Sequence, residues 1–176
     1  LMKSFLRLLL RLCFGFRAFN TASLGAPGPV LLVPNHVSWL DWLFLYVVLD
    51  DDWKFVTSST TAQTSALLRV AMLNRRTFPV NTTSPYAVRE ISEFLEKGGR
   101  LVLFAEGRIS VTGGLMKLFE GTGVLIRKTH AKIITCYLRG ASRLLWVRQE
   151  GWKRWFPRVS AHFSDALTAP ALDHVS

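Results

Sequence analysis

Short apolar runs alternate with longer periodic segments from Gly25 onward, and this pattern predicts an α/β domain. The short runs predict strands over residues 30–33, 55–57, 78–80, 101–104, 132–138 and 159–163. The longer segments have apolar residues at helical spacing and predict helices over residues 38–49, 62–73, 86–97 and 119–129. Strands that alternate with helices of this length form a mixed, largely parallel central sheet with helices on both faces. We therefore expect one such domain over residues 21–176.

The first 20 residues have a different pattern, in which cations interrupt an apolar helix at every fourth position. Lys3, Arg7 and Arg11 fall along one helical face, and apolar side chains such as Phe5 and Leu9 cover the rest. A signal peptide also begins basic and becomes apolar, but here the charges run through the apolar stretch and no small-residue cleavage site follows. We expect residues 1–20 to form an amphipathic helix in a membrane interface, with a helix that packs only on its own domain as the alternative.

Composition and charge also favour a membrane surface. The chain has 176 residues, of which 49% are hydrophobic, so it can bury a core. Lys and Arg number 22 against 12 acidic residues, and a net charge of +10 implies an anionic partner such as phospholipid headgroups, nucleic acid or a phosphorylated substrate. A mean hydropathy of +0.24 is more apolar than a nucleic-acid binder requires. Lipid is therefore favoured over nucleic acid.

Near the end of the chain, residues 143–158 interleave cations with aromatic residues that include Trp152 and Trp155. This pattern is typical of a lipid interface, and it also suits single-stranded nucleic acid or a solvated hairpin edge. No stretch of 18 or more uncharged apolar residues occurs, so we expect peripheral association with the membrane. The two cysteines, Cys13 and Cys136, and the scattered histidines show no metal-ligand spacing, which predicts a reducing compartment and no metal or cofactor.

The sharpest local feature is the run from Pro34 to Asp41, where an apolar strand meets an apolar helix. Inside one α-helix, His36 and Asp41 would lie roughly 140° apart and would not meet. If His36 lies in the turn, Ser38 caps the helix and Asp41 occupies its first turn, the carboxylate can fold back toward the imidazole. A carboxylate that fixes the tautomer of a histidine builds a general base. The alternative is a simple capping box beside a turn histidine.

A second cluster follows the strand over residues 101–104. Glu106, Gly107 and Arg108 emerge from the end of this strand, and active sites of α/β domains lie at the carboxyl ends of strands. Downstream glycines and Lys117 add flexible backbone and a cation before a predicted helix, which suits a phosphate. The residues alone therefore indicate a histidine base beside a phosphate pocket.

These two clusters carry a family resemblance. The patterns Asn35-His36-x-Ser38-x-x-Asp41 and Phe104-x-Glu106-Gly107-Arg108 resemble the first and third signature blocks of the glycerolipid acyltransferases related to bacterial lysophosphatidate acyltransferase. The similarity runs through most of the chain. Within the family, the run 106–117 most resembles the acyltransferase domain of the bifunctional 2-acylglycerophosphoethanolamine acyltransferase/acyl-acyl-carrier-protein synthetases.

The resemblance implies a cofactor-free transferase in which a lysophospholipid hydroxyl attacks an acyl thioester. His36 removes the hydroxyl proton and Asp41 orients His36, with no covalent acyl-enzyme. The acceptor site is lined by Glu106, Gly107 and Arg108.

Cations are expected to hold the glycerol phosphate at this site. The resemblance assigns this role to Arg108 and Lys117, through charge-assisted hydrogen bonds. Arg75 and Arg76 fall near the second block of the family, where a cation also serves phosphate, and an ordinary surface role is the alternative for either.

The resemblance also implies the substrates and the setting. The expected acceptor is 2-acylglycerophosphoethanolamine, with 1-acylglycerol-3-phosphate as the alternative. The donor is a thioester of acyl-carrier protein or coenzyme A, with the carrier protein favoured. We expect association with the cytoplasmic face of the inner membrane, a fused synthetase domain elsewhere in a longer polypeptide, and no nucleic acid.

Two other classes of function fit the sequence less well. A serine hydrolase would need a Gly-x-Ser-x-Gly elbow, which the sequence lacks. A non-catalytic basic module that binds anionic membrane or nucleic acid would explain the charge, but it would leave the blocks around His36 and Glu106 as coincidence.

Overall fold

The computed structural model describes residues 2–58, 76–81, 84, 86–113, 116–145, 147 and 151–168. Its elements, in chain order, are α1 (Met2–Phe14), β1 (Arg17–Phe19), η1 (Thr21–Gly25), β2 (Val30–Pro34), α2 (Asp41–Tyr46), β3 (Trp53–Ser58), β4 (Thr77–Val80), α5 (Tyr86–Glu96), β5 (Arg100–Val102), α6 (Gly121–Thr129), β6 (Lys132–Arg139), η2 (Ala141–Arg143) and β7 (Ser160–Phe163). Each predicted strand is present, and the helix predicted over residues 62–73 lies outside the described residues.

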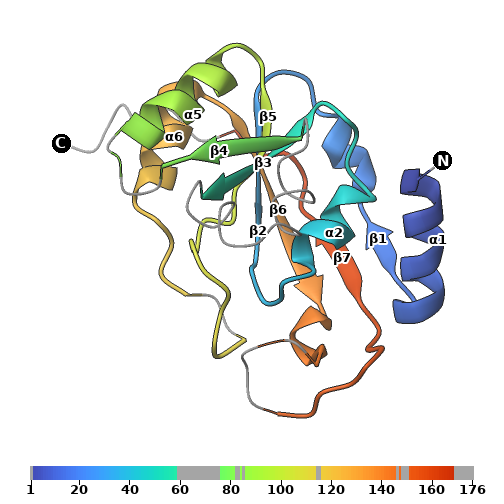
Figure 1. Ribbon diagram of the computed structural model, residues 1–176. Helices are drawn as coiled ribbons and strands as arrows, with labels where there is room; N and C mark the ends of the chain where they lie inside the picture. Colours follow the sequence, from blue (N-terminus) through green and yellow to red (C-terminus); the bar gives the residue numbers. More distant parts are fainter. Residues whose placement is uncertain are drawn as a thin grey trace.

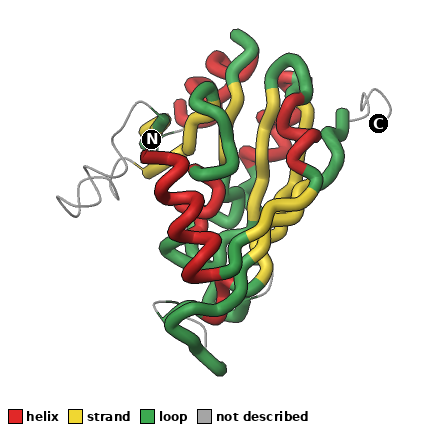
Figure 2. The backbone as a smooth tube through the Cα atoms, turned by 90° about the vertical axis from the view of Figure 1, so that its right-hand side faces the viewer, coloured by secondary structure: helices red, strands yellow, loops and turns green. Residues whose placement is uncertain are grey.

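The strands form a seven-stranded sheet in the order β1-β7-β6-β2-β5-β3-β4 (Figure 1). Neighbouring strands pair in parallel, except for the antiparallel pair β6 and β7. Helices lie on both sides of the strands (Figure 2). The prediction of a largely parallel sheet flanked by helices is therefore confirmed.

The central strand β2 shows why its sequence is apolar at consecutive positions. Val30, Leu31 and Leu32 are all completely buried. Val30 and Leu32 lie in a core cluster with α1 and α2, whereas Leu31 lies in the cluster with α5 and α6. Burying each such side chain contributes about 1.5–3 kcal/mol. A strand covered on both faces needs apolar side chains on both.

The first 20 residues form a shorter helix than predicted. Helix α1 ends at Phe14, Gly15 follows with a positive φ of 54°, and the chain then enters β1, a strand that was not predicted from the sequence. Strand β1 pairs with β7, about 140 residues later in the chain, and two of its three side chains are exposed. Leu10 and Phe14 of α1 are buried in the core of the domain. The helix thus packs on the sheet and α2 as part of the same fold.

Candidate active site

The two predicted clusters meet at one edge of the sheet. His36 follows β2, the segment 104–110 follows β5, and β2 and β5 are parallel neighbours. The segments are also bonded to each other, because the Ser110 N–H donates to the His36 carbonyl oxygen at 2.7 Å. The carboxyl ends of parallel strands are the usual location of an α/β active site.

Asp41 holds the His36 ring from within the fold. The Nδ1 of His36 lies 2.9 Å from Asp41 Oδ2, and the aspartate is completely buried. Oδ2 also accepts the N–H groups of Val37 at 2.6 Å and Ser38 at 2.8 Å, and the Ser38 hydroxyl donates to Oδ1 at 2.6 Å. Because a carboxylate only accepts hydrogen bonds, we assign the proton of the neutral ring to Nδ1. The lone pair of Nε2 is then available to a substrate.

The turn before α2 makes this contact possible. Helix α2 begins at Asp41 rather than at Ser38, and the Ser38 hydroxyl accepts the Leu40 N–H at 3.2 Å. The backbone of Val37 and Ser38 thereby wraps around the carboxylate. The predicted placement of His36 in the turn and of Asp41 in the first helical turn matches the geometry. The prediction that Ser38 caps the helix is wrong, because the helix begins at Asp41, its N-cap residue is Leu40, and the Ser38 hydroxyl donates to Asp41 instead. The helix is also shorter than predicted and ends at Tyr46.

Phe104 supports the imidazole from a ring face, a role that was not predicted from the sequence. Its ring stacks on His36 with a centroid distance of 4.2 Å and an interplanar angle of 29°. The signal was present in the sequence, since Phe104 is part of the run that carries Glu106. The His36 side chain keeps 21% of its surface exposed, so the ring is fixed but accessible.

Glu106 lies differently from the expectation that it lines the acceptor site. Its Oε1 accepts the His36 backbone N–H at 3.1 Å, and its Oε2 accepts the Met116 N–H at 3.1 Å. The residue is 8% exposed. Both oxygens therefore join the histidine turn to the loop after β5. Gly107 follows with a φ of 67°, a conformation that favours glycine.

Arg108 and Lys117 lie on the loop between β5 and α6 and are exposed. The Lys117 ammonium lies 3.0 Å from Glu120 Oε1 in an ion pair whose side chains are both 83% exposed. Exposed pairs of this kind are weak and readily exchange partners. Both cations are accessible to an anionic ligand, and their proposed contact with phosphate stays a prediction.

Arg75 and Arg76 were expected to serve phosphate near the second signature block of the family, and the structure describes only Arg76. Arg75 lies outside the described residues. Arg76 is 7% exposed and donates to the carbonyl oxygens of Tyr46, Leu49, Asp50 and Trp53. It also precedes β4, so it lies at the amino edge of the parallel strands, opposite the edge that carries His36. Because its guanidinium is enclosed by carbonyl groups at the wrong edge, Arg76 is not part of the candidate site.

The cations of α1 also differ from the expected membrane-facing stripe. Lys3 donates to the Leu49 carbonyl and Arg7 to the Val47 carbonyl, so both fasten α1 to the end of α2. Arg11 lies farther along the helix and lines a surface cavity. The exposed apolar side chains of α1 are Met2, Phe5, Leu8, Leu9 and Leu12. The exposed surface of α1 thus combines these five apolar side chains with Ser4, Arg7 and Arg11, and two of the three cations are hydrogen-bonded to the segment after α2.

Trp152 and Trp155 lie in the segment before β7 and are 91% and 64% exposed. No helix among the described residues is both long and apolar enough to cross a membrane. The same part of the chain contains no group of three acidic, histidine or cysteine side chains arranged to hold a metal ion.

Comparison with known proteins identifies the family. The Acyltransferase family model matches residues 18–139, a range that contains His36, Asp41, Glu106 and Arg108. The chain belongs to the acyltransferase family. This confirms the broad resemblance found in the sequence, while its narrower form, to the bifunctional enzymes, stays a prediction.

The similar proteins include one curated relative and one solved structure. The chain is 34% identical over 109 residues to the lyso-ornithine lipid O-acyltransferase of Brucella abortus (strain 2308). The match covers 60% of this chain and 40% of that protein, so it spans about two fifths of the curated relative. The fold is similar to the crystal structure of the 1-acyl-sn-glycerophosphate (LPA) acyltransferase, PlsC, from Thermotoga maritima, with a TM-score of 0.70, 17% identity, and coverage of 95% of this chain and 67% of the other.

Proposed function

We propose that this acyltransferase domain moves a fatty acyl group from a thioester to the free hydroxyl of a lysolipid, with His36 as general base. The observation that carries the proposal is the 2.9 Å contact between His36 Nδ1 and the buried Asp41 carboxylate. A histidine with one nitrogen bonded to a carboxylate and the other accessible is suited to accept a proton from an alcohol.

The proposed reaction uses this geometry. The Nε2 of His36 takes the hydroxyl proton as the alcohol oxygen attacks the thioester carbonyl, and Asp41 stabilises the imidazolium that forms. The tetrahedral intermediate then breaks its carbon–sulfur bond, and the departing thiolate receives the proton from His36. The products are an ester and a free thiol, and His36 returns to its starting state without a covalent acyl-enzyme.

The headgroup of the acceptor would be held by Arg108 and Lys117. Both are exposed, and both belong to the loop that Glu106 joins to the His36 turn. A guanidinium and an ammonium on one loop suit a phosphate or another anionic headgroup. Because the same loop carries the cations and contacts the base, an anchored headgroup would bring its lipid hydroxyl toward His36.

Three acceptors are candidates. The resemblance of the run 106–117 favours 2-acylglycerophosphoethanolamine, and 1-acylglycerol-3-phosphate is the alternative from the wider family. The name of the Brucella relative adds a lyso-ornithine lipid. The donor is an acyl thioester of acyl-carrier protein or coenzyme A.

We further propose that the domain acts on the cytoplasmic face of the inner membrane as a peripheral protein. The exposed apolar side chains of α1 and the exposed rings of Trp152 and Trp155 are each suited to the lipid interface. A synthetase domain in the same polypeptide is part of this proposal.

The experiment is a panel assay with the purified protein and vesicles. Each of the three lysolipids is incubated with acyl-coenzyme A and with acyl-carrier-protein thioester, and the acylated product is measured by mass spectrometry. We expect one lysolipid to be acylated at least tenfold faster than the others. Binding to anionic vesicles without acylation of any lysolipid would instead support the non-catalytic module.

A further inference from the structure

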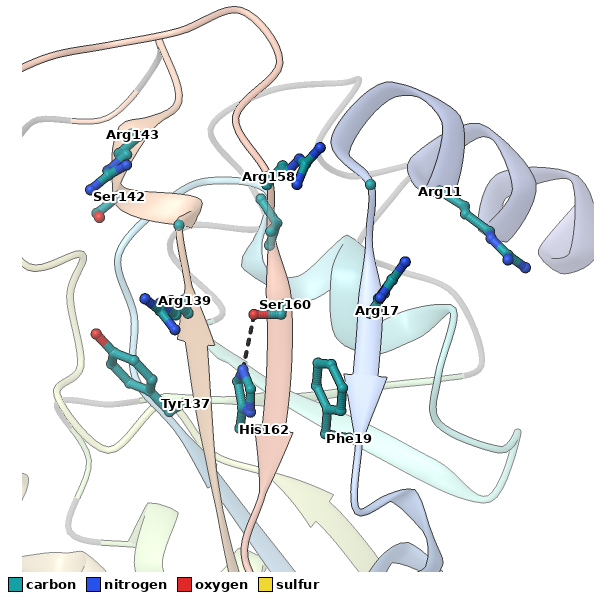
Figure 3. A pocket seen from close by; sticks show the side chains of 13 residues that line it. Arg11, Arg17, Phe19, Tyr137, Arg139, Ser142, Arg143, Arg158, Ser160 and His162 are labelled. Atoms are coloured by element: carbon teal, nitrogen blue, oxygen red, sulfur yellow. Dashed lines mark hydrogen bonds between the residues drawn. The ribbon is translucent and has the colours of Figure 1, made fainter.

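One part of the sheet surface is open and lies outside the candidate active site. Along β6, Tyr137 and Arg139 alternate with Cys136 and Leu138, which are buried in the cluster with α1 and α2. Tyr137 and Arg139 therefore point to the opposite face. Helices α5 and α6 pack on that face over β2, β5 and β4, whereas Tyr137 and Phe19 are 58% and 46% exposed. A cavity of about 850 Å³ opens over β6, β7 and β1 (Figure 3).

Five arginines line this cavity. They come from α1, β1, β6, η2 and the segment before β7, and they are Arg11, Arg17, Arg139, Arg143 and Arg158. Among the described residues, none of these five arginines forms an ion pair. No described Asp or Glu side chain lines the cavity. By contrast, Arg76, Arg89 and Arg100 each face a carboxylate. Clustered cations without acidic partners attract a ligand with several negative charges.

The cavity also has an aromatic platform. The rings of Phe19 and His162 are stacked, with centroids 4.8 Å apart and planes inclined by 13°. His162 Nε2 lies 2.9 Å from the Ser160 hydroxyl, which fixes the orientation of its ring. The exposed ring of Tyr137 lines the same cavity. Flat ring faces beside arginines suit a ligand that combines a planar base with phosphates.

Two connections lead from this cavity to the active site. The Leu138 N–H donates to the Asn35 amide oxygen at 2.7 Å, so the strand that carries Tyr137 and Arg139 is bonded to the residue before His36. A second cavity of about 480 Å³ shares Ser142 and Arg143 with the first. It is also lined by Thr112 and Gly113, in the loop that follows Glu106.

We propose that the arginine-lined cavity binds the 3′-phosphorylated adenosine diphosphate end of a coenzyme A thioester. This inference rests on the proposed acyl transfer and identifies the donor. The three phosphate groups match the cluster of arginines, and the adenine matches the aromatic platform. In coenzyme A a flexible pantetheine arm separates the nucleotide from the thioester, so a nucleotide site beside the active site, rather than over His36, is the expected position.

The concave shape favours this ligand over two other anionic partners. A flat membrane surface would contact the rim of the cavity and leave its floor, which carries the stacked Phe19 and His162 rings, unused. An acidic carrier protein would contact the arginines but would have no planar group for the aromatic platform. The experiment below distinguishes binding of the nucleotide from binding of a membrane surface or of a carrier protein.

The test measures binding of adenosine 3′,5′-bisphosphate by calorimetry, using the whole chain. Arg17→Gln combined with Arg139→Gln removes two charges from the cavity. Arg127→Gln combined with Lys128→Gln removes two exposed charges from the end of α6 and serves as the matched control. We expect at least tenfold weaker binding for the first variant and less than a twofold change for the control, with circular dichroism unchanged for both.

Kinetics and vesicle binding give the contradicting outcomes. We expect the first variant to raise the KM for acyl-coenzyme A by at least tenfold and to leave the KM for the lysolipid unchanged. Equal bisphosphate affinity in both variants would overturn the proposal. The proposal would also be overturned if the first variant raised the KM only for acyl-carrier-protein thioester. It would likewise be overturned if the only property this variant lost were co-sedimentation with phosphatidylglycerol vesicles. Calorimetry is repeated on His36→Ala, where retained bisphosphate binding without turnover separates the donor site from the chemistry.

Discussion

The Glu106 carboxylate accepts a hydrogen bond from the backbone N–H of His36 at 3.1 Å, across 70 residues of sequence. Its other oxygen accepts the Met116 N–H. Glu106 thus fixes the position of the histidine turn relative to the loop that carries Arg108. Both of these hydrogen bonds are to backbone N–H groups, and neither involves the imidazole ring.

Glu106→Gln should therefore lower both stability and turnover. The amide retains one acceptor oxygen, but its NH₂ group faces a backbone N–H, so one partly buried donor loses its partner, and the cost is below the roughly 1–3 kcal/mol of a fully buried one. Urea unfolding measures the stability, and we expect kcat to fall at least tenfold under conditions where the variant is folded. Glu93→Gln, in an exposed pair with Arg89, is the control and should change neither quantity. An unchanged kcat for Glu106→Gln would contradict this positioning role.

Arg76→Gln should destabilise the fold and leave acceptor binding unchanged. The guanidinium donates to four backbone carbonyls at the amino edge of the sheet, so its loss leaves buried acceptors unpaired. Hydrogen bonds to a charged group contribute about 1.5–3 kcal/mol, and we expect a loss of stability of at least that size in urea unfolding. Arg108→Gln is the comparison, with the opposite pattern of a raised acceptor KM and normal stability. A raised acceptor KM for Arg76→Gln would restore its predicted phosphate role.

The exposed apolar side chains of α1 should drive vesicle binding. Phe5 and Leu12 are 65% and 74% exposed, so replacing both with serine removes apolar surface without opening the core. Transfer of each side chain into lipid contributes about 1.5–3 kcal/mol, and we expect at least a tenfold fall in vesicle partitioning measured by co-sedimentation. Tyr86→Ser, at a 64% exposed position on α5, is the control. Equal partitioning of the double variant and the control would argue against α1 as the membrane contact.

Cys136 should be inert to alkylation in the folded protein. Burial raises the pKa of its thiol to about 12. At pH 8 only about one molecule in ten thousand then carries the reactive thiolate, and the fraction grows tenfold with each pH unit up to the pKa. In a Cys13→Ser background, we expect no modification by iodoacetamide over an hour at pH 8 and complete modification in 8 M urea. Rapid labelling without denaturant would show that β6 opens at this position.

The sequence pattern predicted those parts of the structure that depend on residues close to one another in the chain. Strands β2 and β6 are nearly continuous apolar or β-branched runs, and the His36 turn depends on residues within five positions of one another. Strand β1 escaped prediction because it has three residues and its partner, β7, is far away in the chain. Pattern analysis detects periodicity, and so short an element has none.

The roles of the basic residues could not be predicted for a different reason. Lys3, Arg7 and Arg76 donate to backbone carbonyls, which every residue carries and which leave no mark in the sequence. The spacing of Lys3 and Arg7 correctly placed them on one helical face, but the direction of that face depends on how α1 packs on α2. The arginine-lined cavity likewise joins three separate stretches of the chain, residues 11–19, 137–143 and 158–162.

The most direct test of His36 as the general base is single-turnover acyl transfer by the His36→Ala and Asp41→Asn variants, bound to vesicles and saturated with donor and lysolipid. We expect His36→Ala to slow the chemical step by at least a hundredfold and Asp41→Asn to slow it by at least tenfold, since general-base catalysis contributes about 10²–10⁴-fold. Both variants should retain vesicle association. A single-turnover rate for folded His36→Ala within twofold of the unmodified protein would contradict the assignment of His36 as the base.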